Sequence, residues 1–146
     1  MQPFPHHYQV QVNAEANQPL TTGCDQLPPL RVDTPTTFGG SGEHWSPEEL
    51  LLAALGNCYA LSFRALAKAS GLAWVSLDVA VEGVLDKVER QMRFTRATLR
   101  VGLTLAPGAD LDAAERQLQR AESICIVANS LRVPLALITE VQAGVG

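Results

Sequence analysis

The sequence predicts one α+β domain spanning residues 1–146. Three observations predict it: segments that alternate apolar and polar residues, one long apolar segment with helical start and stop signals, and the order of these segments. The expected order is a β-hairpin, a long helix, a second hairpin, two helices and a final strand. Separate runs of strands and helices are typical of antiparallel sheets covered by helices. A chain of 146 residues can bury roughly two-thirds of its unfolded surface around one core.

Two short strands are expected near the N-terminus. Residues 8–14 alternate, with Tyr8, Val10 and Val12 on one face. Residues 17–29 are rich in turn formers, and their prolines restrict strand pairing there. Residues 30–33 would form the returning strand, followed by a loop rich in glycine, proline and threonine.

The longest predicted helix begins after Ser46 and ends before Gly71. Ser46 and Glu49 fit a capping box, and Pro47 suits the first helical position. Apolar side chains lie nearly all round this helix, and Gly71 is a natural stop. We expect it to be central and buried on most sides, and a second subunit is one way to bury it. One stripe contains Leu51, Ala54, Leu55, Cys58, Leu61, Ser62 and Ala65.

A long hairpin and a helical region are expected to follow. Residues 74–85 and 94–105 alternate as antiparallel strands with one solvent-exposed face. The basic residues between positions 87 and 96 would lie around their turn. Asp110 is expected to cap a second helix, residues 124–131 to form a third, and residues 134–142 to form the final strand.

Charge and composition argue against several classes of partner. The formal net charge is −4 and the basic residues are scattered, which leaves no basic surface for nucleic acid or an anionic membrane. The apolar runs are interrupted before the ~20 residues that span a bilayer. The N-terminus lacks the pattern of a secretory signal, so we expect a cytoplasmic protein.

Three cysteines carry the candidate chemistry, and they fit neither a disulfide framework nor a zinc ribbon. In a reducing compartment, cysteines that pair are usually transient, catalytic or redox-sensing. Taken alone, Cys58 fits as a small hydrophobic residue of the helix stripe. Cys125 lies between the last two helices, where backbone N–H groups would favour its thiolate. Cys24 lies in a turn and is expected to be an incidental surface thiol.

No metal or cofactor site is expected. His6 and His7 lie near the N-terminus, and His44 lies in the glycine-rich loop without a helical partner. The GGSG segment lacks the lysine and spacing of a P-loop, and no GxSxG motif occurs.

Two segments resemble the OsmC/Ohr superfamily, the osmotically inducible and organic hydroperoxide resistance proteins. They read TPTTFGGSGEHWSPEELLLAALGNCYALSF and AESICIVANSLRVPLAL. In that superfamily a glycine-rich loop leads into a Pro-Glu helix start. A cysteine follows ten residues after the Glu, and a second cysteine lies at the head of a late, short helix. Pro47, Glu48, Cys58 and Cys125 occupy these places, and the order of elements matches over essentially the whole chain.

The resemblance implies an OsmC-like fold, an intertwined homodimer and two sites at its interface. It also implies that the Cys58 thiolate attacks an organic hydroperoxide and becomes a sulfenic acid. Cys125 would condense with it to a disulfide, which an external dithiol reduces. In a continuous helix Glu48 lies about 15 Å from Cys58 of its own chain. We therefore hypothesise that antiparallel helices bring Glu48 of the partner subunit near Cys58.

One residue of the superfamily pattern is missing. Its peroxidases use an arginine of the N-terminal hairpin, but residues 16–18 stand in that place here, and no lysine or arginine precedes Arg31. Without a guanidinium, an apolar setting is expected to raise the pKa of Cys58. Arg31, Arg93 or Arg96 could replace it from another direction.

Three interpretations stay open. The first is a thiol-dependent peroxidase with Cys58, Cys125 and Glu48 at its site, suited by its apolar helix to alkyl or lipid hydroperoxides. The second is a non-catalytic dimer that binds a small apolar ligand or senses oxidants, which the missing arginine favours. The third is a structural dimer with two inert core cysteines. Fast alkylation of Cys58 near neutral pH would favour the first.

Overall fold

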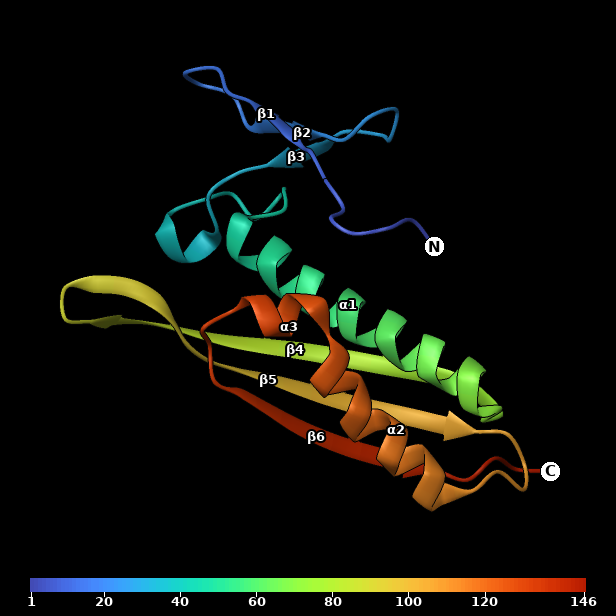
Figure 1. Ribbon diagram of the computed structural model, residues 1–146. Coiled ribbons are helices and arrows are strands. Elements are labelled where there is room, and N and C mark those ends of the chain that lie inside the picture. The colour runs from blue at the N-terminus through green and yellow to red at the C-terminus, as the bar shows by residue number, and fades with distance from the viewer. The chain divides into compact units, whose positions relative to one another are not determined.

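Two three-stranded sheets and three α-helices make up the protein, whose computed structural model describes residues 1–146 (Figure 1). The predicted α+β class is confirmed. The chain divides into two compact units, Met1–Leu51 and Leu52–Gly146, and each contains one of the sheets.

The N-terminal sheet has three antiparallel strands, one more than expected. They are β1 (Gln11–Asn13), β2 (Leu20–Gly23) and β3 (Leu30–Val32), with β2 in the middle. The prediction of turns throughout residues 17–29 is therefore wrong for β2. Its two central threonines are β-branched and suit a strand, while Pro19 and Gly23 confine it to four residues, too few to show an alternating pattern.

The long helix α1 spans Pro47–Ser70, as its start and stop signals predict. The Ser46 hydroxyl accepts the Glu49 N–H at 3.2 Å and donates to the Glu49 carboxylate at 2.7 Å. At the other end Gly71 has a φ of +70°, and the Leu72 N–H donates to the carbonyl of the last turn at 3.0 Å. This left-handed glycine closes the helix as a Schellman motif does.

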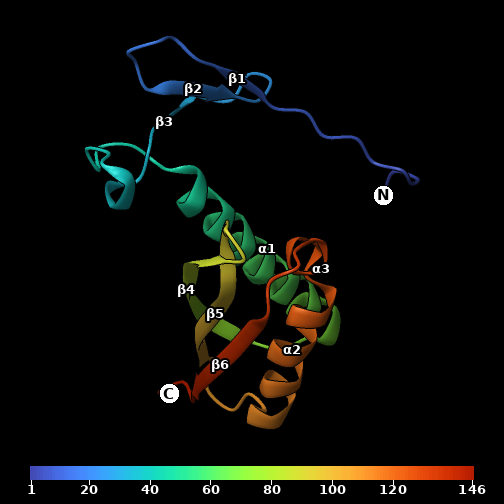
Figure 2. The same cartoon turned by 90° about the vertical axis from the view of Figure 1, so that its left-hand side faces the viewer.

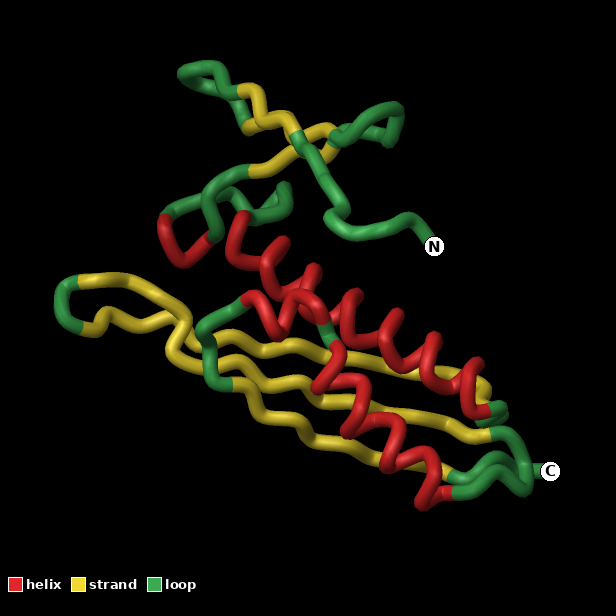
Figure 3. The backbone as a smooth tube through the Cα atoms, viewed as in Figure 1, coloured by secondary structure: helices red, strands yellow, loops and turns green.

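The C-terminal sheet is built on a long hairpin of β4 (Trp74–Val88) and β5 (Gln91–Leu105). Their antiparallel pairing is confirmed, and the basic residues lie around the turn. The final strand β6 (Leu135–Gln142) pairs with β5 in the parallel direction, so this sheet is mixed rather than antiparallel throughout. Figure 3 shows its strands in yellow beside the helices in red. Parallel entry requires a long crossover, which the two helices before β6 provide.

The crossover consists of α2 (Leu111–Ile124) and α3 (Ile126–Ser130). The Asp110 carboxylate caps α2 as expected, accepting two backbone N–H groups at 2.9 and 3.2 Å. Figures 1 and 2 show α2 and α1 side by side on one face of the β4–β5–β6 sheet. The core lies between these helices and the inward face of β5, and Cys125 is part of it.

Only one side of α1 is fully buried within the chain. The buried residues are Leu55, Tyr59, Phe63 and Ala67, spaced four apart. Of the stripe predicted from the sequence, Leu55 alone belongs to this line, and Leu61 is 54% exposed. The sequence pattern could not distinguish the two sides, because apolar residues occur on both.

By length and composition alone, α1 could cross a membrane, contrary to the expectation that no apolar run is long enough. The central helix of a soluble protein passes the same test, so this finding is weak evidence for a membrane segment.

Candidate functional site

The structure brings Cys58 and Cys125 together. Cys58 lies midway along α1 and is partly buried, whereas Cys125 is fully buried between α2 and α3. Both are free thiols, and the S–H of Cys125 lies within hydrogen-bonding reach of the Cys58 sulfur. Two residues far apart in the sequence thus form a dithiol within the C-terminal unit.

A sharp change of backbone direction places Cys125 at this point. Its φ of −65° and ψ of 112° are extended, so it ends α2 and serves as the N-cap of α3. The Asn129 N–H donates to the Cys125 carbonyl at 2.9 Å, and the Asn129 side chain donates to the Ser123 carbonyl at 3.1 Å. These bonds hold α3 against the end of α2.

The surroundings of Cys58 lower its pKa. Burial raises it, but the backbone N–H of Val127, the S–H of Cys125, the N–H of Ile126 and the Ser62 hydroxyl together lower it further than burial raises it. Donors of this kind stabilise a thiolate. The expectation that an apolar setting without a guanidinium raises this pKa is therefore wrong, because amide donors of α3 face the sulfur.

The pKa of Cys125 is shifted the other way. Burial raises it, the N–H groups of Ala128 and Val127 oppose that effect, and the neighbouring Cys58 raises it again. The pKa values of the two thiols are therefore shifted in opposite directions, so Cys58 loses its proton more readily than Cys125. Backbone N–H groups of α3 do favour the Cys125 thiolate, as expected, but burial and the neighbouring Cys58 outweigh them.

Two side chains of the site were not singled out by sequence reasoning. The Ser62 hydroxyl lies one turn after Cys58, near its sulfur, and donates to the Cys58 carbonyl at 2.8 Å. The Tyr59 hydroxyl, fully buried, donates to the Leu118 carbonyl of α2 at 2.9 Å. The i, i+4 spacing of Ser62 could have been noticed, but nothing in the sequence points Tyr59 at Leu118.

Glu48 lies in the first turn of α1, as predicted, and belongs to the N-terminal unit. One of its carboxylate oxygens is buried without a hydrogen-bond partner. Its support of Cys58 stays a prediction.

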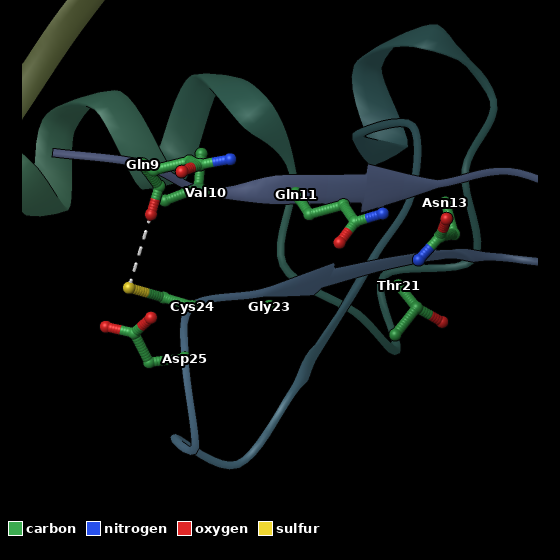
Figure 4. A pocket seen from close by; sticks show the side chains of 8 residues that line it. All are labelled: Gln9, Val10, Gln11, Asn13, Thr21, Gly23, Cys24 and Asp25. Atoms are coloured by element: carbon green, nitrogen blue, oxygen red, sulfur yellow. Dashed lines mark hydrogen bonds between the residues drawn. The ribbon is translucent and has the colours of Figure 1, made fainter.

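The third cysteine also lies in the N-terminal unit. The Cys24 thiol donates to the Gln9 carbonyl at 3.4 Å, beside a polar surface hollow of about 360 Å³ along β1 and β2 (Figure 4). The same hollow is lined by Asn13, Thr21 and Asp25. Cys24 is partly exposed and lies outside the unit that holds the dithiol.

None of the groups that act on the Cys58 thiol is a basic side chain. Arg93 and Arg96 lie towards the turn of the β4–β5 hairpin, and Arg31 donates to the Thr21 hydroxyl at 2.7 Å in the N-terminal sheet. No three His, Cys, Asp or Glu side chains gather as a metal site would require.

Comparisons with known proteins agree with this architecture. A family model described as OsmC-like protein matches residues 40–140. The protein YmaD of Bacillus subtilis is 25% identical over 146 residues, covering 97% of each chain. Peroxiredoxin OsmC of Escherichia coli is 27% identical over 92 residues, which are 63% of this chain and 64% of that protein.

Solved structures show the same fold. An OsmC-like protein from Vibrio cholerae superimposes with a TM-score of 0.83 at 18% identity, covering 94% of this chain and 100% of its own. An organic hydroperoxide resistance protein OsmC from Legionella pneumophila has a TM-score of 0.73 at 20% identity, covering 94% and 99%. At such identities the likeness concerns the fold alone.

Proposed function

Since this chain belongs to the OsmC-like protein family, we propose that it is a thiol-dependent peroxidase that reduces organic hydroperoxides. The observation that carries the proposal is the Cys58–Cys125 pair, in which one thiol has a lowered pKa and its neighbour a raised one. A lowered pKa marks the attacking thiol of a redox site, and a protonated neighbour can complete a disulfide.

The proposed reaction has two steps on the protein. The Cys58 thiolate attacks the terminal, OH-bearing oxygen of the hydroperoxide, and the O–O bond breaks. The other oxygen leaves as the alkoxide, which takes a proton from solvent to become the alcohol, and Cys58 is oxidised to a sulfenic acid. The Cys125 sulfur then attacks the Cys58 sulfur, an S–S bond forms, and the sulfenic hydroxyl leaves with a proton as water. An external dithiol restores both thiols by exchange.

Backbone amides take the place of the missing arginine in this proposal. The N–H groups of Ile126 and Val127 act on the Cys58 sulfur where related peroxidases are expected to use a guanidinium. Amide donors are held rigidly by the backbone of α3, so they stabilise the thiolate without a mobile side chain.

An exposed apolar side chain near Cys58 supports an organic substrate. Ile126, whose N–H acts on the Cys58 sulfur, is 74% exposed. An alkyl or aryl group gains free energy by covering such surface, whereas hydrogen peroxide gains nothing there. We therefore propose a preference for bulky, apolar hydroperoxides.

A homodimer is part of the proposal. The exposed side of α1 carries Ala54, Leu61 and Ala65, which are apolar and lack cover within the C-terminal unit. A second copy of α1 packed antiparallel would cover this side and could place Glu48 of the partner subunit near Cys58. The Glu48 carboxylate oxygen that lacks a partner is consistent with such a role. A stable monomer at micromolar concentration would contradict this part.

A non-catalytic dimer that binds an apolar ligand or senses oxidants is the second candidate. It is favoured by one observation, the absence of a basic side chain at the Cys58 sulfur. Without that positive charge, oxidation could be slow enough to serve sensing rather than turnover.

A single-turnover experiment separates these candidates. Reduced protein is mixed with one equivalent of cumene hydroperoxide, and separately with hydrogen peroxide, and peptide mass spectrometry locates any disulfide. We expect a rapid Cys58–Cys125 bond that forms faster with the organic peroxide. In Cys125→Ser a sulfenic acid should persist on Cys58, whereas Cys24→Ser should behave as the wild type. Oxidation no faster than that of a free thiol would refute the peroxidase.

A further inference from the structure

A buried hydroxyl lies next to the dithiol in the sequence and connects its two helices. Tyr59 directly follows Cys58 in α1, is fully buried, and donates to the Leu118 carbonyl of α2 at 2.9 Å. A buried hydroxyl without a partner would be costly, so this bond fixes where Leu118 can lie relative to α1.

A short, rigid path leads from this bond to Cys58. Leu118 and Cys125 are seven residues apart, about two helical turns along α2. The Asn129 side chain then ties α3 to the end of α2 through the Ser123 carbonyl. The position of α2 along the axis of α1 therefore determines whether Cys125 and the α3 amides reach the Cys58 sulfur.

The hydroxyl is not needed for packing or for the Leu118 carbonyl. The tyrosine ring fills the core beside Leu55 and Phe63, and a phenylalanine ring would fill the same space. A helical carbonyl also accepts a backbone N–H four residues later. Burial, Glu122 and Glu115 raise the pKa of Tyr59, so it keeps its proton and donates at any physiological pH.

We propose that Tyr59 is a positioning residue for the Cys58–Cys125 disulfide. Its hydroxyl holds α2 at the position along α1 where the two sulfurs are close enough to bond. This inference rests on the proposed function for its biological role. The step it serves is the loss of water between the Cys58 sulfenic acid and the Cys125 thiol, with formation of the S–S bond.

Tyr59→Phe tests the inference, because it removes the hydroxyl and keeps the ring. The primary readout is the equilibrium with glutathione, in which one oxidised glutathione converts the dithiol to the disulfide and yields two reduced glutathiones. We expect the equilibrium constant for the disulfide to fall about tenfold, which is a shift of about 30 mV in reduction potential. The disulfide should also form more slowly after one equivalent of cumene hydroperoxide.

Thr139→Val is the matched control. The Thr139 hydroxyl donates to the Glu115 carboxylate at 3.0 Å and ties α2 to β6, so its loss also removes one bond of α2 without touching the path to Cys125. Its glutathione equilibrium should equal that of the wild type. An unchanged equilibrium in Tyr59→Phe, or an equal shift in Thr139→Val, would overturn the inference. If Tyr59→Phe does not fold, Asn129→Ala is the second variant, because it removes the bond from the Asn129 side chain to the Ser123 carbonyl that ties α3 to α2. An unchanged glutathione equilibrium in Asn129→Ala would also overturn the inference.

The two proposals fail in different experiments. The glutathione equilibrium needs no peroxide, so a protein that does not react with cumene hydroperoxide still answers the question about Tyr59. Conversely, rapid peroxide turnover together with an unchanged reduction potential in Tyr59→Phe would refute the positioning role of Tyr59 and leave the proposed peroxidase activity supported.

Discussion

Cys24 in the N-terminal unit and Cys58 in the C-terminal unit carry the same side chain but have different neighbouring groups. Cys24 follows β2 in the N-terminal sheet, and its thiol donates to a backbone carbonyl. Cys58 lies on α1, and its sulfur faces backbone N–H groups and a second thiol. Exposure does not distinguish them, because both are partly buried.

The difference lies in the polarity of the neighbouring groups. A carbonyl accepts the proton of a thiol and gives a thiolate no stabilisation, whereas an amide N–H donates to the thiolate. Backbone N–H groups in the first turn of a short helix therefore favour the Cys58 thiolate, which is the form that attacks the peroxide in the proposed reaction. The location of that helix matters more than the apolar composition around it.

The largest expected effect comes from removing the thiol that the amides face. Cys58→Ser should lower the rate of cumene hydroperoxide reduction by about 10³-fold or more, because loss of a nucleophile removes the covalent step. Cys24→Ser should leave the rate unchanged. Peroxide consumption with a dithiol reductant measures both rates. A large loss in Cys24→Ser with none in Cys58→Ser would mean that Cys24 is the reactive thiol.

A smaller effect is expected from removing one amide donor. Ile126→Pro deletes the N–H at the first position of α3, where proline is tolerated, and the extended Cys125 before it suits a following proline. The pKa of Cys58 should rise, leaving less thiolate at neutral pH. Its alkylation rate should fall about tenfold or more, since a hydrogen bond to a charged group is worth about 1.5–3 kcal/mol.

Ile126→Ala is the control for this substitution, because it shortens the same side chain and keeps the N–H. Its alkylation rate at neutral pH should stay close to that of the wild type. Equal rates in Ile126→Pro and Ile126→Ala would mean that the α3 amide does not activate Cys58.

The smallest effect on the thiols is expected at the start of α1. Ser46→Ala removes the hydroxyl that accepts the Glu49 N–H, and it should lower the free energy of unfolding by about 1 kcal/mol. Alkylation of Cys58 should not change, because the cap lies in the first turn and Cys58 midway along the helix. Denaturant unfolding and alkylation on the same samples measure both, and slower alkylation would mean that helix fraying reaches the dithiol.

The ends of the helices could be predicted from the sequence, because capping residues and glycines act locally. The bounds of α1 follow from Ser46, Pro47 and Gly71, and the cap of α2 follows from Asp110, because these residues act on the backbone beside them. The strand β2 escaped notice because four residues cannot establish a period. The parallel entry of β6 depends on how the two crossover helices return the chain, which no local pattern records.

The site was less predictable for a physical reason. The cysteines could be chosen through the resemblance to a family, but the donors that activate Cys58 are backbone N–H groups, which every residue other than proline carries. Their effect comes from the position of α3, and the sequence around Cys58 alone predicted the opposite pKa shift. The hydrogen bond between Tyr59 and Leu118 could not be predicted from a local pattern either, because it joins residues 59 positions apart.

The activation of Cys58 is tested by the pH dependence of its alkylation in reduced protein, compared between the folded and the urea-unfolded chain and located by peptide mass spectrometry. The lowered pKa of Cys58 in the fold predicts that its alkylation persists to lower pH in the folded chain than in the unfolded one. Alkylation that falls off at the same or a higher pH in the folded chain would contradict the conclusion that the α3 amides make Cys58 the reactive thiol.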